Sequence, residues 1–281
     1  MAATEATGSK RDTAHRVVKN TWVEPLARVG YLARGIVYVL VGVLALMVAL
    51  GLRGATEDKS GALATIGHST PGRYLLFALA IGLAGYSLWG FVRAIFDPMR
   101  KGKSPKGLAE RAGFIVSAVS YGALILPALR LATGNGEGET QSAEQGTAWV
   151  LAQPLGHWLV IAAGVIAMIG GGGQLWAGIT ARFAKDFRPG MEKHEHDWAV
   201  RFGRFGHIAR GVIFAMAGFF LVRAALTFNP EEAQGLDETL ATLARQPYGT
   251  VLLGAVALGL ISFGIYSILL TRWMQVVKPK E

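Results

Sequence analysis

The chain has 281 residues, of which 52% are hydrophobic and 17% are charged, and its formal net charge is +9. A soluble domain of this length usually carries about a quarter charged residues, so the composition argues against a protein surrounded by water on all sides. Cysteine is absent, which excludes disulfides, thiolate metal sites and thiol catalysis.

The first 21 residues are polar and basic. They lack the short apolar segment and small-residue cleavage site of a removable signal peptide. We therefore expect residues 1–21 to form a polar tail on the cytoplasmic side of a membrane.

Six apolar stretches follow this tail, each near the length of about 20 residues that a helix needs to cross a bilayer. In chain order they cover residues 35–52, 74–92, 112–129, 158–181, 211–228 and 247–271. Only the fifth contains a charged residue, Arg223. The sequence therefore predicts an all-α integral membrane bundle of six transmembrane helices.

The basic residues are concentrated on one side of these predicted spans. The N-terminal segment, the connections after the second and fourth spans, and the C-terminal segment together hold 22 of the 28 Lys and Arg residues. Short cytoplasmic loops carry such an excess in membrane proteins, so we expect both termini to be cytoplasmic. Insertion topology and anionic headgroups already account for the net charge, and we expect no nucleic-acid partner.

One phrase occurs three times along the chain: RVGYLARGIVY at 28–38, RAGFIVSAVSY at 111–121 and RFGHIARGVIF at 204–214. Each copy is followed by a proline 41 residues after its first glycine. This spacing predicts three two-helix repeats, at 22–100, 101–190 and 191–281. Two spans return the chain to its starting side, so the repeats are parallel and favour a pseudo-threefold axis along the membrane normal.

The three Arg-x-Gly phrases resemble those of the DUF1206 family (domain of unknown function 1206), bacterial multi-pass membrane proteins with three such units. The middle copy departs from the pattern, with Ser117 where Arg34 and Arg210 stand in the others. The resemblance implies the fold and a location in the bacterial plasma membrane. It implies no activity.

Five arginines of the repeated phrases are candidates for contact with an anion or a lipid headgroup: Arg28, Arg111, Arg204, Arg34 and Arg210. A ring of arginines around an axis can select an anion. The alternative is that each arginine anchors its helix by extending toward phosphate headgroups.

Arg130 and Arg223 each follow the first glycine of their repeat by 17 residues and lie near the outer end of a predicted span. They are candidates for an outer gate. Pairing with acids of the outer connections, such as Glu137 or Glu231, is the simpler interpretation, because both positions are peripheral.

The remaining polar and aromatic features favour a structural interpretation. The segment MEKHEHDW at 191–198 is expected to be a solvated charged loop and not a metal site, because its histidines are two positions apart. Aromatic residues near span ends, such as Tyr31 and Trp89, are expected to belong to the interfacial belt. The four glycines at 170–173 indicate either tight helix packing or a broken helix.

The apolar stretches contain no Asp or Glu, which disfavours an ion-coupled transporter. We therefore expect a non-enzymatic membrane protein without a metal or cofactor, acting through lipid contact or association with other membrane proteins. The alternative is a passive, anion-preferring channel or transporter along the pseudo-threefold axis.

Overall fold

The structure, a computed structural model, describes residues 23–52, 70–98, 101–102, 104–134, 143–188 and 190–273. These ranges are helical and contain no β-strand. The predicted polar tail at 1–21 and the outer connection of the first repeat at 53–69 lie outside the described residues.

Among these described residues, six helical segments are long and apolar enough to cross a membrane, as the sequence predicts. They are α2 (Val23–Ala49), α4 (Thr70–Phe96), α5 (Pro105–Gly122) continued by α6 (Ile125–Thr133), α8 (Gly156–Thr180), α9 (Lys193–Leu226) and α11 (Gly249–Trp273). The described connections between them contain the shorter helices α7 (Ala143–Leu151), η1 (Arg182–Asp186), η2 (Pro230–Glu232) and α10 (Leu236–Ala244).

The third segment is divided into α5 and α6 at residues 123–124. Pro127 causes this break, because proline has no backbone N–H and its ring conflicts with the carbonyl four residues earlier, here that of Ala123. The first helical hydrogen bond after the break runs from the Ala128 N–H to the Leu124 carbonyl, at 3.1 Å. Gly134 then ends α6 in the left-handed conformation, with φ of 76°.

The fifth segment begins much earlier than its apolar stretch, because α9 starts at Lys193. The expectation of a charged loop over 191–198 is therefore wrong from Lys193 onward. The physical reason is a buried stripe of small and polar residues at helical spacing, which charge counting alone does not reveal. Its members are Ala199, Gly203, Gly206 and His207.

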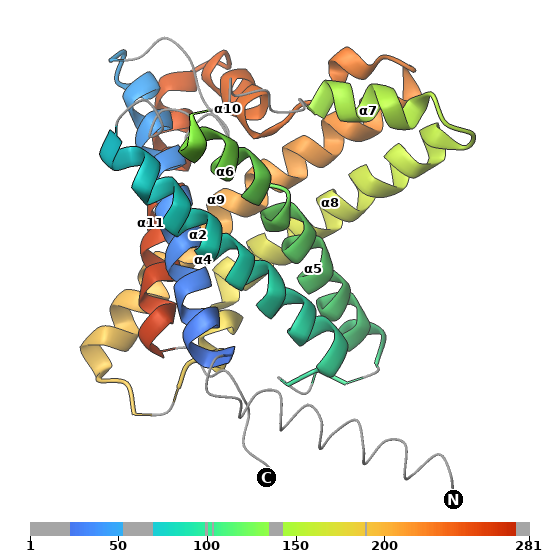
Figure 1. Cartoon of the computed structure of the whole chain (residues 1–281). Helices are drawn as coiled ribbons and strands as arrows, with labels where there is room; N and C mark the ends of the chain where they lie inside the picture. Colours follow the sequence, from blue (N-terminus) through green and yellow to red (C-terminus); the bar gives the residue numbers. More distant parts are fainter. Residues whose placement is uncertain are drawn as a thin grey trace, which may run out of the picture.

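The long helices form an open arc in which each packs against the next. Their spatial order is α5, α4, α2, α11, α9 and α8. In Figure 1, α8 and α9 leave the centre as one pair, and α4 and α5 leave it as another. The two ends of the arc, α5 and α8, are the two long helices of the middle repeat, and they are not an extensively packed pair.

Successive repeats meet through small residues at equivalent positions. At each junction the backbones approach closely, because glycine or a small side chain leaves no bulk between the helices. Ser87 donates a hydrogen bond to the Ala118 carbonyl at 2.8 Å. The corresponding pairs are Gly171 with Gly211 and Gly264 with Gly35, where a Cβ on either partner would lie 2.6–2.8 Å from the facing carbonyl oxygen.

Short helices precede the returning spans in the second and third repeats. α7 and α10 each end just before a turn that leads into α8 or α11. A Cβ at Gly156 or Gly249 would overlap the carbonyl of Val150 or Ala244 in these turns. The backbone therefore requires glycine at the start of each returning helix.

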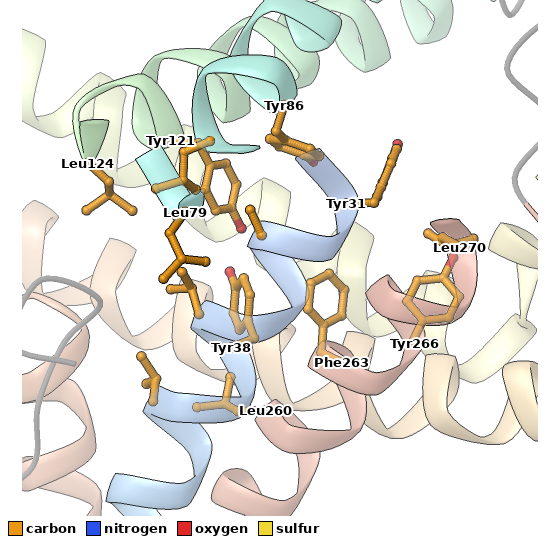
Figure 2. Close-up of a cluster of buried hydrophobic side chains, with 14 of the residues drawn as sticks. Tyr31, Tyr38, Leu79, Tyr86, Tyr121, Leu124, Leu260, Phe263, Tyr266 and Leu270 are labelled. Carbon is orange, nitrogen blue, oxygen red and sulfur yellow. The ribbon is translucent and has the colours of Figure 1, made fainter. Parts of the chain in front are cut away.

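Buried aromatic side chains fill the centre of the fold. Tyr31 and Tyr38 of α2, Tyr86 of α4, Tyr121 of α5 and Phe263 and Tyr266 of α11 converge there (Figure 2). The expectation that Tyr31 and Trp89 belong to an interfacial belt is wrong, because they are only 4% and 1% exposed. The packing of α2 against α4 turns both side chains inward.

Candidate functional site

Arg34 lies on α2 at the centre of a buried polar network. Its Nη1 donates to the Tyr86 hydroxyl at 2.6 Å, and its Nε and Nη2 both donate to the Ser267 hydroxyl, at 3.2 and 2.9 Å. Its Cζ also lies 4.7 Å from the ring centroid of Tyr31 and 5.0 Å from that of Phe263. Arg34 is thereby hydrogen-bonded to α4 and α11.

Arg210 approaches the same aromatic residues from α9. Its Cζ lies 4.2 Å from the ring centroid of Phe263 and 4.9 Å from that of Phe214. Phe263 consequently has two guanidinium groups within 5.0 Å of its centroid, those of Arg34 and Arg210. The structure thus brings together two of the sequence-predicted candidates, which occupy equivalent positions in the first and third repeats.

Ser117, which replaces arginine in the middle repeat, reaches the same network from α5. Its Oγ lies 3.4 Å from the Tyr86 hydroxyl oxygen, which also accepts from Arg34. The equivalent positions of the three repeats therefore meet in one aromatic and polar cluster, with two guanidinium groups and one hydroxyl.

Arg93, in the last turn of α4, completes this cluster, and sequence analysis missed it. It is 6% exposed, and its Nη1 donates to the Tyr31 hydroxyl at 3.0 Å. Its Cζ lies 4.3 Å from the ring centroid of Phe114. Its Nε and Nη2 are buried and have no hydrogen-bond partner among the residues that the structure describes. We call Arg34, Arg93 and Arg210 the arginine cluster.

The arginine cluster places three positive charges against aromatic rings and hydroxyl groups. The apolar stretches of the sequence provide no carboxylate to balance these charges. Each ring face within about 6 Å attracts a cation by roughly 0.5–2 kcal/mol, depending on desolvation. A buried charge without a counter-ion remains costly in spite of such contacts. The cluster is therefore an electropositive site inside the helical bundle.

His207 is buried beside the cluster, on α9. Its Nδ1 lies 2.7 Å from the Gly203 carbonyl oxygen, to which it must donate because a carbonyl only accepts. The ring stacks on Phe183, with centroids 4.5 Å apart and planes at 5°. These contacts give the imidazole a packing role next to Tyr266, whose ring centroid is 5.3 Å away.

The three entry arginines lie on three different helices: Arg28 and Arg111 are within the first two turns of α2 and α5, whereas Arg204 lies about three turns inside α9. Arg111 donates to the last carbonyls of α4, those of Ala94 at 2.7 Å and Ile95 at 3.2 Å. This geometry anchors the start of α5 to the end of α4. Arg204 is exposed on α9 and Arg28 is half-buried on α2. A joint anion site formed by these three residues stays a prediction.

The two candidates for an outer gate differ in their surroundings. Arg223 forms an ion pair with Glu232 of η2, with 2.9 Å between Nε and Oε2. Arg130 is exposed on α6. Glu137, one of the acids expected to pair with them, lies outside the described residues. Gating by Arg130 and Arg223 stays a prediction. The acid that pairs with Arg223 is Glu232 and not its neighbour Glu231.

The histidines of the segment at 191–198 lie on the first turns of α9. The Trp198 indole donates to Nε2 of His194 at 3.1 Å, and Nδ1 of His196 lies 3.7 Å from Oδ1 of Asp197. Among the described residues, no group of three or more His, Asp or Glu side chains is placed to hold a metal ion.

The middle repeat lacks the contact that closes the other two. In the first repeat, a Cβ at Gly30 would lie 2.5–2.8 Å from Tyr86, and in the third a Cβ at Gly206 would lie 2.5–2.7 Å from Phe263. The equivalent pair of the middle repeat is Gly113 and Gly170, and no described atom of another helix lies within 4 Å of either Cβ position. Gly172 and Gly173 of α8 are equally uncovered.

Comparison with known proteins points to one family. A family model described as Domain of Unknown Function (DUF1206) matches residues 29–97, 112–181 and 205–274. The chain is also 41% identical to the uncharacterized protein YxxB of Bacillus subtilis (strain 168) over 249 residues, which cover 88% of this chain and 90% of that protein. No solved structure matches the chain.

Proposed function

The chain belongs to the DUF1206 family, and from that premise we propose that it is a non-enzymatic multi-pass protein that binds a transmembrane helix of another membrane protein. The bound helix would lie between α5 and α8, in the open middle repeat. We further propose that the protein resides in the bacterial plasma membrane with both termini in the cytoplasm, where the excess of Lys and Arg favours them.

The open middle repeat carries this proposal. In the first and third repeats, the outgoing helix rests on an aromatic residue of the returning helix, Tyr86 or Phe263. In the middle repeat a glycine, Gly170, takes the place of that aromatic residue. The spans that contain α5 and α8 are the least buried of the six described spans. Of the residues in their most apolar stretch, 22% and 17% are buried.

Glycine favours a protein helix over lipid as the occupant. Small residues bring two backbones together at every described junction between repeats. On α8 itself, Gly171 packs closely against α9. Lipid chains gain nothing from a glycine surface, whereas a helix gains close packing and weak backbone contacts. The uncovered glycines Gly170 and Gly173 lie three positions apart, on one face of α8.

An incomplete pseudo-threefold arrangement is part of the proposal. The equivalent junction pairs support it, as does the meeting of the three equivalent positions 34, 117 and 210 around Tyr86 and Phe263. Contact between α5 and α8 would close the arc into a ring. A guest helix in the gap would take the place of that contact.

Photocrosslinking from two matched glycines tests the proposal. A photoreactive phenylalanine analogue is placed at position 170 or, as a control, at position 172, in membranes of the native host. Gly172 is equivalent to the exposed Leu88 of the first repeat, so it should face lipid. We expect a discrete protein adduct from position 170 and lipid adducts alone from position 172. Lipid adducts alone from both positions, or a crosslink from 170 to α5, would contradict the proposal.

The packing supports an anion-preferring pathway along the axis less than it supports the binding of a helix. Tyr31, Tyr86 and Phe263 are at most 4% exposed and fill the space between the helices at the level of the arginine cluster. Reconstitution into liposomes tests this alternative. A selective anion flux that is lost in the Arg34→Gln variant would favour it over helix binding.

A further inference from the structure

Arg93 presents an unused pair of hydrogen-bond donors inside the bundle. Within the described part of the chain, its Nε and Nη2 are buried without a hydrogen-bond partner, while its Nη1 donates to the Tyr31 hydroxyl. Nε and Nη2 point in the same direction and form the side of the guanidinium that binds two oxygens of one anion at once. We propose that Arg93 binds a phosphate group, either inorganic phosphate or that of a phospholipid headgroup.

Arg34 shows what the same pair of donors does when it has a partner. Its Nε and Nη2 both donate to the Ser267 hydroxyl. Arg93 is buried to the same degree, at 6% exposed against 7% for Arg34. Buried polar groups in folded proteins nearly always have a hydrogen-bond partner, and an exception is explained by strain, function or an unseen ligand. A bound oxyanion supplies the missing acceptors.

The local charge also favours an anion. Arg111 lies at the same end of α4 and donates to the carbonyls of Ala94 and Ile95. The nearby carboxylate of Glu110 is already paired with Lys101, at 2.9 Å. The carboxylate of Asp97 likewise accepts from the backbone N–H groups of Lys101 and Gly102. The rings within 6 Å of the Arg93 Cζ carry no charge, and a bound anion would remove part of the cost of burying the guanidinium.

Phosphate is the oxyanion that fits the depth of the site. Arg93 is three residues from the end of α4 at Phe96, or about 5 Å along the helix axis, which is near the headgroup level of a spanning helix. Guanidinium groups bind phosphate oxygens with two parallel N–H···O bonds. Both a lipid phosphate and a phosphate ion from the adjoining solution reach this level.

Phe114 packs against the face of the Arg93 guanidinium. Its ring centroid is 4.3 Å from Cζ of Arg93, and its side chain is only partly buried, at the contact between α4 and α5. The unused Nε–H and Nη2–H donors lie in the plane of the guanidinium, so a ring on its face leaves them able to bind two oxygen atoms at the edge. Phe114 therefore helps to position the guanidinium, and the anion binds at a different side of it.

Binding measurements on the full-length protein in two arms test the proposal and separate the two sources. In the first arm, protein in phosphatidylcholine nanodiscs is titrated with inorganic phosphate. In the second, protein in detergent is titrated with phosphatidylglycerol and retained lipid is measured by native mass spectrometry. We expect saturable binding in at least one arm, and the arm that shows it identifies the source.

Three variants assign the binding to Arg93. Arg93→Lys keeps the charge but loses the paired donors, and we expect it to weaken binding by about tenfold or more. Arg201→Lys makes the same change at an exposed arginine of α9 and should leave binding within about twofold. Arg93→Gln removes the charge together with the paired donors and should weaken binding at least as much as Arg93→Lys.

Each contrary outcome overturns the proposal. These outcomes are no saturable binding in either arm, equal weakening by Arg93→Lys and Arg201→Lys, or unchanged binding in Arg93→Lys. Should Arg93→Lys fail to give a monodisperse protein, Arg93→Gln takes its place: weaker binding supports the site, and unchanged binding refutes it. The helix-binding proposal is independent of this result, because its crosslinks report on α8.

Discussion

Arg34 holds Ser267 through both Nε and Nη2, although 233 positions separate the two residues in the chain. Ser267 in turn donates to the Phe263 carbonyl at 2.8 Å. One serine hydroxyl therefore links the first span to the last through a buried guanidinium. This link joins the first and third repeats at the point where Arg210 also contacts Phe263.

Removal of the Ser267 hydroxyl should destabilise the protein. Ser267→Ala leaves two buried donors of Arg34 without an acceptor, which costs about 1–3 kcal/mol. We expect a lower midpoint of thermal unfolding in detergent. Ser262→Ala is the matched control on the same helix, because the Ser262 hydroxyl bonds only to the Leu258 carbonyl of its own helix. Equal midpoints for the two variants would refute a structural role for the Arg34 link.

A methyl group at Gly264 should separate α11 from α2. The Cβ of Gly264→Ala would lie 2.6 Å from the Gly35 carbonyl oxygen and 2.8 Å from the backbone nitrogen of Val39, so the helices must move apart. Overpacking of this kind costs about 1–3 kcal/mol. Gly172→Ala is the control, since nothing lies within 4 Å of its Cβ. Thermal unfolding of both variants checks the difference, and a neutral Gly264→Ala would contradict the close packing.

The spans were predictable from sequence, because the length of an apolar stretch is a local property. The start of α9 at Lys193 was not, because charged residues suggest a loop until the buried stripe of the helix is known. Arg34 and Arg210 were recognised as candidates through their repeat, but their meeting at Phe263 depends on which helices are neighbours.

Arg93 was missed because its position near a span end suggested an ordinary loop charge. One signal was present in the sequence: Tyr31 and Phe114, which surround Arg93 in the structure, occupy the same place in the repeated phrase. Aromatic residues at equivalent positions facing one arginine could have suggested a buried contact. The opening of the middle repeat could not be predicted either. Its sequence difference, Gly170 where the other repeats have Tyr86 and Phe263, gains a meaning only once the helix contacts are known.

The outer ion pair of Arg223 should contribute little to stability. Its side chain is 54% exposed, and exposed ion pairs contribute about 0–1 kcal/mol. We expect Arg223→Gln and Glu232→Gln each to lower the unfolding midpoint slightly, with the double variant no worse than the sum of the two. A double-mutant cycle by thermal unfolding measures this coupling. A coupling well above 1 kcal/mol would show that solvent screens the pair less than its exposure indicates.

Lys101 should make the stability of the protein depend on alkaline pH. Burial alone would lower its pKa, but the hydrogen bond to Glu110 and the charges of Asp186 and Asp97 outweigh it, so that the pKa is raised above its usual value. A raised folded-state pKa stabilises the protein fully below the unfolded pKa of about 10.4. This stabilisation is lost as the pH rises through the folded pKa.

Stability measured from pH 8 upward in the Lys101→Met variant checks this sign. The variant should be less stable than the original protein at the lower pH, and the gap should narrow above about pH 10.4. Lys185→Met, at an exposed lysine of η1, is the control and should show a constant small difference. A gap for Lys101→Met that widens with rising pH would show that the raised pKa is wrong.

Single-cysteine labelling should place the ends of α4 and α8 on the cytoplasmic side. The chain has no cysteine, so an introduced thiol reports on one site alone. Lys185 follows α8, and Gln246 precedes α11; both are exposed, and they lie at opposite ends of spans. The excess of Lys and Arg on the Lys185 side favours its location in the cytoplasm.

A membrane-impermeant maleimide should therefore label Gln246→Cys in intact cells, but label Lys185→Cys only after permeabilisation. The reverse pattern would invert the topology and would place Arg93 at the outer leaflet, where the phosphate source changes from the cytoplasm to the cell exterior.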